Sequence, residues 1–111
     1  MKIVNLTKHD VVVIHEGSQI IYPSAGEARV TSTQQRCAIV DGVPVFKSVF
    51  HLPVEGLPEE KKGMMYIVSS LVCMACPSRR DLISPNTHYS SVIRDEKGQV
   101  KAVSSFQCFW E

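Results

Sequence analysis

The sequence predicts a single domain, residues 1–111, of the α+β class, with mainly antiparallel strands in a small compact sheet or partly open barrel and one short central helix. Three observations predict this fold class. Short runs rich in Val and Ile alternate with turn residues through the first half. The apolar run Met64–Val68 is followed by serines that can cap a helix. A chain of this length supports only one hydrophobic core.

The first half predicts strands joined by turns. Glu16-Gly17-Ser18 turns the chain back on itself in a hairpin. Asp41-Gly42 is a favoured two-residue hairpin turn. Pro44 has no backbone N–H, which indicates an edge strand or an irregular strand start. The predicted strands are rich in β-branched residues and too short for helices, and they cover residues 2–5, 11–15, 19–22, 27–32, 37–40 and 43–46.

The second half predicts a central strand, a helix and a closing hairpin. Met64–Val68 is typical of a strand that is buried on both faces. A helix over 71–76 follows the capping pair Ser69-Ser70 and ends at Pro77. Loops and then hairpin strands are expected over residues 52–63, 78–87, 91–94 and 99–110. The aromatic side chains expected in the core are Phe46, Phe50, Tyr66, Phe106, Phe109 and Trp110.

Charge and hydropathy exclude several classes of protein. The 12 basic and 11 acidic residues give a net charge of 12 − 11 = +1, which offers no electrostatic basis for binding duplex nucleic acid or an anionic membrane. With 44% hydrophobic and 21% charged residues, the chain is not disordered. The first residues lack the apolar run of a secretory signal, and no apolar stretch reaches the ~20 residues that span a bilayer. We therefore expect a cytoplasmic protein.

Cys73 and Cys76 form a CxxC pair near the end of the predicted helix. Zinc needs two more ligands than one such pair supplies. A redox pair is not favoured either, because the dipole at a helix C-terminus opposes thiolate formation. Apolar packing is the favoured interpretation, with a zinc or redox role as the alternative. We expect no cofactor and no bound metal.

The sequence does not favour an enzyme. The four histidines, which are scattered without ligand spacing, are His9, His15, His51 and His88. No nucleophile elbow or pair of catalytic acids is visible in the sequence. A Cys–His hydrolase is the alternative, because such partners need only meet in the fold.

The main functional signal surrounds the predicted helix. Ser69 and Ser70 are expected to present hydroxyl and first-turn N–H groups, a combination that favours anions. Arg79 and Arg80 follow the helix, and their guanidinium groups are suited to phosphate or diphosphate. Asp81 is suited to accept from a ribose hydroxyl or an adenine amino group. The alternative is that Ser69 only caps the helix and that Arg79, Arg80 and Asp81 pair on the surface.

Four further polar residues are candidates for contact with ribose or base. Asn5, Thr7 and His9 lie in the first connection, and Asn86 lies in the predicted loop before the closing hairpin. Asn and Thr also favour turns because they hydrogen-bond to nearby backbone groups. A purely structural role for the Asn5–His9 cluster is therefore the alternative.

Motifs spread over nearly the whole chain carry a resemblance. They are Asn5-Leu6-Thr7-x-His9-x-Val11, Gly56-Leu57-Pro58, Tyr66-Ile67-Val68-Ser69-Ser70-Leu71-Val72, Arg79-Arg80-Asp81-Leu82 and Val92-Ile93-Arg94-Asp95-Glu96-x-Gly98. On these motifs the chain resembles a group of small, largely uncharacterised proteins encoded by phages and bacteria. The CxxC pair is not among the motifs, and they include no enzymatic motif. Some small phage proteins act as sponges that sequester nucleotide-derived immune signals without cleaving them, and the resemblance raises that role as an expectation.

The leading hypothesis is therefore a binder without catalytic activity. Its expected ligand is a small phosphorylated, nucleotide-derived signal of the ADP-ribose or cyclic-nucleotide type, sequestered in the cytoplasm of a bacterial host. A homo-oligomer is expected, because so small a domain cannot easily enclose a nucleotide alone. The alternative is a structural or protein-interaction accessory protein, whose mark would be a broad exposed apolar patch without a polar pocket.

Overall fold

The structure, a computed structural model, describes residues 1–110. It contains ten strands and one helix. In chain order these are β1 (Lys2–Asn5), β2 (Val11–His15), β3 (Ser18–Tyr22), β4 (Arg29–Val40), β5 (Val43–Glu55), β6 (Met64–Ile67), α1 (Ser70–Ala75), β7 (Leu82–Pro85), β8 (Val92–Arg94), β9 (Val100–Val103) and β10 (Phe106–Gln107). The sequence prediction of a strand-rich chain with one short helix is confirmed.

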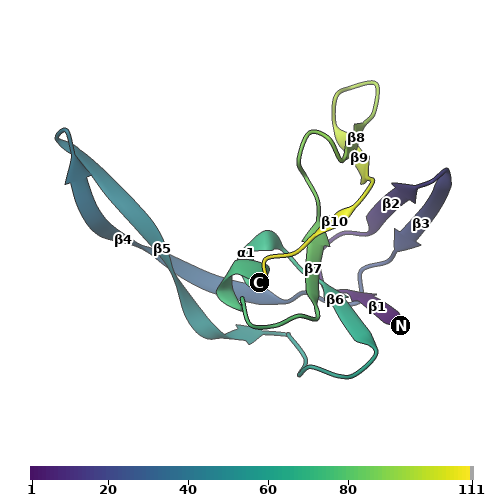
Figure 1. The fold of residues 1–111 in the computed structure, drawn as a ribbon, viewed down its shortest axis with the longest axis horizontal. Coiled ribbons are helices and arrows are strands. Elements are labelled where there is room, and N and C mark those ends of the chain that lie inside the picture. Colours follow the sequence, from purple (N-terminus) through teal and green to yellow (C-terminus); the bar gives the residue numbers. More distant parts are fainter. Residues whose placement is uncertain (111) are drawn as a thin grey trace.

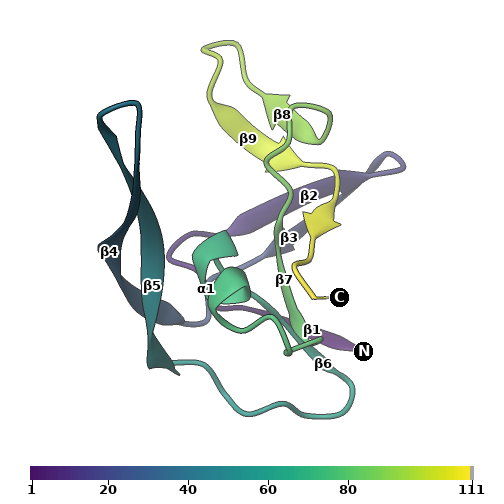
Figure 2. The ribbon, with the colours of Figure 1, turned by 60° about the vertical axis from the view of Figure 1, so that its left-hand side comes forward.

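The strands form two four-stranded sheets and one separate hairpin. The sheet orders are β1-β6-β7-β10 and β3-β2-β9-β8, and we call these sheets with α1 the body. β4 and β5 pair only with each other, and we call this hairpin the arm. Figure 1 shows the arm projecting from the body, and Figure 2 shows it standing apart from both sheets.

The body has three layers, with β6 in the middle. Tyr66 faces α1, where it shares a core cluster with Val72 and Cys73. Ile67 faces the opposite way and packs in a second cluster with side chains of the other sheet, among them Val13 of β2. Because side chains alternate along a strand, a strand covered on both faces needs apolar residues at every position. The predicted burial of this run on both faces is confirmed, since Tyr66 and Ile67 are buried.

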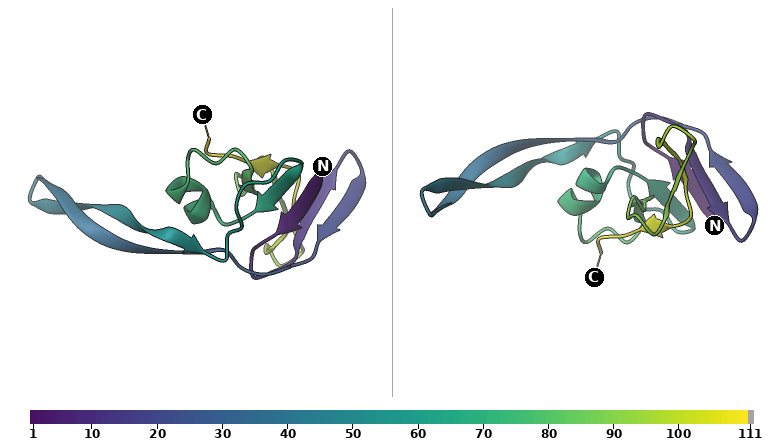
Figure 3. Two further views of the ribbon diagram at one scale, coloured as in Figure 1. Left: turned by 90° about the horizontal axis from the view of Figure 1, so that it is seen from below. Right: turned by 90° about the horizontal axis from the view of Figure 1, so that it is seen from above.

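The expected strand directions and overall shape are met only in part. Parallel pairing joins β1 to β6, β6 to β7 and β2 to β9, while the four other strand pairs are antiparallel. Residues 1–110 form no closed barrel. The radius of gyration is 16.1 Å, whereas a compact domain of this length has ~13 Å. The prediction of a compact sheet is wrong because the arm, seen edge-on in Figure 3, extends away from the core.

Three local predictions need correction. The predicted loop 78–87 contains β7, whose residues Leu82 and Ile83 are buried in the body. The predicted strands over 27–32 and 37–40 belong to one long strand, β4, which begins only at residue 29 and continues through 33–36. Phe46, predicted in the core, lies on the arm and is 52% exposed. Tertiary neighbours explain the differences in burial. β7 is buried because β6 pairs beside it, and Phe46 is exposed because no other element within residues 1–110 packs on that part of the arm.

Candidate functional site

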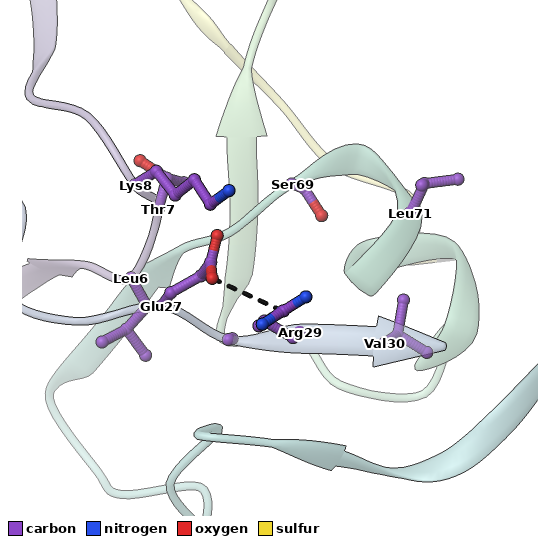
Figure 4. A pocket seen from close by; sticks show the side chains of 9 residues that line it. Leu6, Thr7, Lys8, Glu27, Arg29, Val30, Ser69 and Leu71 are labelled. Carbon is purple, nitrogen blue, oxygen red and sulfur yellow. Dashed lines mark ion pairs between the residues drawn. The ribbon is translucent and has the colours of Figure 1, made fainter. Parts of the chain in front are cut away.

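A surface pocket of about 260 Å³ lies where the loop after β1, the start of β4 and the start of α1 meet (Figure 4). We call it the Ser69 pocket. It is lined by Leu6, Thr7, Lys8, Glu27, Ala28, Arg29, Val30, Ser69 and Leu71. Two residues predicted for the site, Thr7 and Ser69, therefore line one pocket although they are far apart in the sequence.

Ser69 caps α1, as predicted. Its Oγ accepts a hydrogen bond from the Val72 N–H at 3.3 Å, which uses an oxygen lone pair and leaves the hydroxyl proton able to donate to a ligand. Ser70 is the first helical residue and does not line the pocket. α1 has only six residues, so we assign its N-terminus no anion site of its own.

Asn5 holds the loop that forms one side of the pocket. Its buried side-chain amide donates to the carbonyl oxygens of His9 at 2.9 Å and Tyr22 at 2.8 Å. Its Oδ1 accepts from the Thr7 N–H at 3.0 Å and lies 2.7 Å from Thr7 Oγ1. These bonds use both donors and the acceptor oxygen of Asn5, so its role is to position the loop. His9 contributes its carbonyl oxygen, and its side chain does not line the pocket.

The charges of the pocket come from residues that sequence reasoning missed. Lys8 extends over the pocket toward Ser69 in Figure 4, and its side chain makes no ion pair with the described residues. Arg29 pairs with Glu27, with 3.5 Å between Nε and Oε1. Two cations and one carboxylate leave the pocket with an excess positive charge. In the sequence these residues show no motif, since only folding brings residue 8 beside residue 29.

The partly buried Arg79 and the buried Asp81 form an ion pair on another part of the body. Arg79 Nε and Nη2 donate to the two Asp81 carboxylate oxygens at 2.8 and 2.7 Å, and Nη2 also donates to the Pro58 carbonyl at 3.0 Å. The hydrogen bonds to Asp81 raise the pKa of Arg79 above its ordinary value. A bidentate guanidinium–carboxylate pair is directional. We call it the Arg79–Asp81 latch, because it fastens the connector before β6 to the start of β7.

The structure does not bring the arginines to Ser69. β6 and β7 are parallel, with Tyr66 opposite Leu82, so residues that precede β7 lie at the start of β6. Ser69 instead follows the end of β6. Arg80 accordingly lines a different pocket, with Glu60, Lys61, Lys62, Met64, Met65 and Asp81. The expected grouping of Ser69 and Ser70 with two guanidinium groups is thus corrected by the parallel βαβ connection.

Asn86 belongs to a hydrogen-bond network that connects the segments around the last strands. Its Nδ2 donates to Ser105 Oγ at 3.1 Å, and its Oδ1 accepts from the His88 N–H at 3.1 Å. Ser105 Oγ in turn donates to the buried Ser91 Oγ at 3.0 Å. Asn86 does not line the Ser69 pocket, and this network gives it a structural role.

The CxxC pair packs as the favoured interpretation predicted. Cys73 is buried in the core cluster beneath α1, and burial raises the pKa of its thiol to about 11. A thiol with that pKa is protonated at neutral pH and is a weak nucleophile and metal ligand. Among residues 1–110, no three His, Cys, Asp or Glu side chains gather into a set that could hold a metal ion.

Comparison of the chain with protein-family models, with curated proteins and with solved structures finds no match. The described residues include no helix with the length and apolar character needed to cross a membrane.

Proposed function

We propose that the protein binds a small phosphorylated, nucleotide-derived ligand in the Ser69 pocket and retains it without transforming it. One observation carries the proposal: the pocket combines the cations of Lys8 and Arg29 with the hydroxyl of Ser69 on one concave surface. Ammonium and guanidinium groups beside a hydroxyl donor form charge-assisted hydrogen bonds with phosphate oxygens.

The remaining lining residues suit the other parts of a nucleotide. The Glu27 carboxylate can accept hydrogen bonds from ribose hydroxyls, as acidic residues do in dinucleotide sites. Leu6, Val30 and Leu71 offer an apolar wall for a base. The volume of about 260 Å³ is slightly below the ~300 Å³ at which ligand pockets begin, which favours a phosphoribosyl group bound with part of the ligand outside.

Sequestration, rather than turnover, is supported by the state of the cysteines and by the resemblance to phage-encoded proteins. The buried Cys73 thiol is held in its protonated form and so is unsuited to nucleophilic attack. The phage-encoded proteins that act as sponges hold signals of the ADP-ribose or cyclic-nucleotide type. We therefore assign the same ligand class and the same mode of action, in the cytoplasm of a bacterial host, to the Ser69 pocket.

The test is binding followed by release. Purified protein is incubated with ADP-ribose, cyclic ADP-ribose and cyclic dinucleotides, and bound ligand is released by heat and identified by mass spectrometry. Recovery of one intact ligand in stoichiometric amount supports the proposal. Recovery of an altered ligand, or no binding of any member of the panel, overturns it.

The matched variants locate the site. Lys8→Ala with Arg29→Ala removes both pocket cations and should weaken binding at least about 100-fold, since each lost charge-assisted bond contributes ~1.5–3 kcal/mol. Lys62→Ala with Lys97→Ala removes the same charge from surfaces outside the pocket and should leave affinity within about twofold. Equal losses in both double variants would show that net charge, and not this pocket, attracts the ligand.

A second candidate function is a protein-interaction module. It is favoured by the arm, whose exposed apolar side chains include Ile39, Val43 and Phe46. Ligand binding and protein binding would use different surfaces, because these residues do not line the Ser69 pocket. A variant lacking the pocket cations should therefore keep any partner that the arm binds.

A further inference from the structure

The end of the arm nearest its turn is apolar on both faces. Cross-strand register places Val40 opposite Val43 and Ala38 opposite Val45, and all four side chains share one face. Ile39, Pro44 and Phe46 lie on the opposite face. These side chains remain in water in the single chain, with Ile39, Val40 and Val43 each about 60% exposed (59%, 61% and 62%). A two-stranded ribbon is marginally stable by itself, so a surface of this kind needs a cover.

Both edges of the arm are protected against pairing with another strand. Val40 and Val43 flank a two-residue turn, so an N–H at position 44 would point to the outer edge, and Pro44 has none. On the other strand, the register shift between Arg36 and Ala38 leaves Cys37 as a bulge. Proline and bulges at an edge prevent strand addition. The cover must therefore pack against the faces of the arm.

The charge at the tip indicates protein rather than lipid as the cover. Asp41 occupies the turn at the far end of the arm, beyond the apolar side chains. A tip that enters a bilayer would bring this carboxylate into the hydrocarbon first, which is unfavourable. The apolar residues instead lie along the strands behind the turn. That arrangement fits packing of the strand faces against protein.

α1 presents exposed apolar side chains beside the base of the arm. α1 contacts both β4 and β5. Its residues Leu71 and Met74, one helical turn apart, are 47% and 42% exposed on the same side of the helix. We call the angle between the arm and this helix face the α1 corner. Figure 3 shows that the arm leaves the body beside α1.

We propose that two copies of this chain interlock, with the arm of each copy packed along the arm of the other and its tip in the α1 corner of the other. The dimer needs no bound ligand, but Leu71 of the α1 corner also lines the Ser69 pocket, so an arm tip and a ligand would meet at this side chain. A two-fold interface needs a surface that is complementary to itself, and each copy supplies both an apolar tip and an apolar corner. Between Thr31 and Phe50 the arm carries only Arg36, Asp41 and Lys47 as charged residues, so two arms approach with little repulsion.

The area available reaches the lower part of the range for stable dimers. Strands of 12 and 13 residues make the arm ~40 Å long, and two strands with their side chains are ~10 Å wide, so each face offers about 400 Å². One face packed along the second arm buries about 400 Å² per copy, and the second face of the tip adds to this in the α1 corner. The dimer therefore buries between about 800 and about 1,600 Å² in total, against ~1,200–2,000 Å² for a standard stable interface. A contact along one face only would fall in the range of weak encounters.

The oligomeric state tests the proposal with a matched pair of variants. Wild-type protein at tens of micromolar is expected to sediment at 2 × 12.4 = 24.8 kDa. Ile39→Thr with Val43→Thr on the arm should raise the dissociation constant at least about 100-fold, since four apolar contacts are weakened in the dimer. The control, Ile21→Thr with Val100→Thr, alters side chains of similar exposure on the body, 53% and 51%. It should leave the dissociation constant of the dimer unchanged. A monomeric wild type, or a dimer unaffected by the arm pair, overturns the proposal.

A disulfide tests where the tip rests. Met74→Cys, made with Cys108→Ser, should form an interchain bond with Cys37 of the second copy under mild oxidation. The same bond within one chain is excluded, because eight residues of strand carry Cys37 ~25 Å beyond the base of β4. Ile21→Cys in the same background is the control and should remain uncrosslinked. A dimer that depends on the arm but gives no Met74→Cys crosslink would overturn the α1 corner as the docking place.

Discussion

The body and the arm are built from similar residues, yet only the body buries them. Val11 and Val13 of β2 are 9% and 5% exposed because β9 and the central sheet cover them. Val43 and Val45 of β5 show the same alternation of valines but are 62% and 37% exposed. The difference lies in the neighbours that the topology supplies. An apolar, β-branched strand therefore predicts that its side chains pack against other protein residues. It does not specify whether those residues belong to the same chain.

The largest expected effect compares one substitution in the two regions. Ile67→Ala removes a fully buried side chain from between the two sheets and should lower the free energy of unfolding by about 3 kcal/mol, through lost burial and the cavity that remains. Ile39→Ala on the arm should change it by less than about 0.5 kcal/mol in dilute protein, where copies are separate. Urea unfolding followed by circular dichroism measures both. Equal effects would mean that the arm packs on the body of its own chain.

A second prediction compares two arginine pairs. Arg79→Ala leaves the Asp81 carboxylate buried without its bidentate partner and should cost about 2 kcal/mol of folding stability. Arg29→Ala removes an exposed pair at the base of the arm, whose contribution should be small. Thermal unfolding gives both values. Arg79→Lys keeps the charge but not the two-pronged geometry, so it should recover only part of the loss.

A third prediction, of similar size to that for Arg79→Ala, concerns alkaline pH. Burial, assisted by the neighbouring Cys108 and Cys76, raises the pKa of the Cys73 thiol from 9.0 to about 11. The folded state thus holds this proton more tightly than the unfolded state. The resulting stability is fully present below pH 9 and is lost as pH rises from 9 to about 11, by about 2 kcal/mol.

The comparison of variants isolates this thiol from other groups that titrate in the same range. Cys73→Ala should flatten the alkaline loss of stability, whereas Cys37→Ala, at an exposed position on the arm, should retain it. Unfolding midpoints measured at pH 8, 9, 10 and 11 supply the curves. If Cys73→Ala and wild type lose stability in parallel, the buried thiol does not cause the loss.

Much of the fold could be predicted where local chemistry determines structure. Ser69 caps α1 as its position before an apolar run indicates, and Asp41-Gly42 forms the expected turn with positive φ angles of 52° and 79°. The apolar run beginning at Met64 forms the central strand. β7 escaped prediction because it is only four residues long, lies between polar segments and ends at Pro85. Its strand character comes from β6, which pairs beside it.

The candidate site was less predictable because residues far apart in the sequence form it. Ser69 and Thr7 could be singled out because both side chains favour backbone turns, but nothing marked Lys8 or Arg29. Sequence proximity instead drew attention to Arg79 and Arg80, which the parallel connection places at the other end of β6. A helix between two parallel strands carries its two flanking segments to opposite ends of the sheet. Residues ten apart in such a unit are therefore poor candidates for one site.

Gly56 links the arm to the Ser69 pocket. It has φ +76°, and a Cβ at this position would clash with the backbone oxygen of Glu27, so the chain leaving the arm passes close to a residue that lines the Ser69 pocket. Arg29 is both a pocket cation and the first residue of β4. A substitution that moves the base of the arm therefore also moves a charge of the Ser69 pocket. Evolution of the arm and of the pocket is therefore coupled through this one contact between backbone segments.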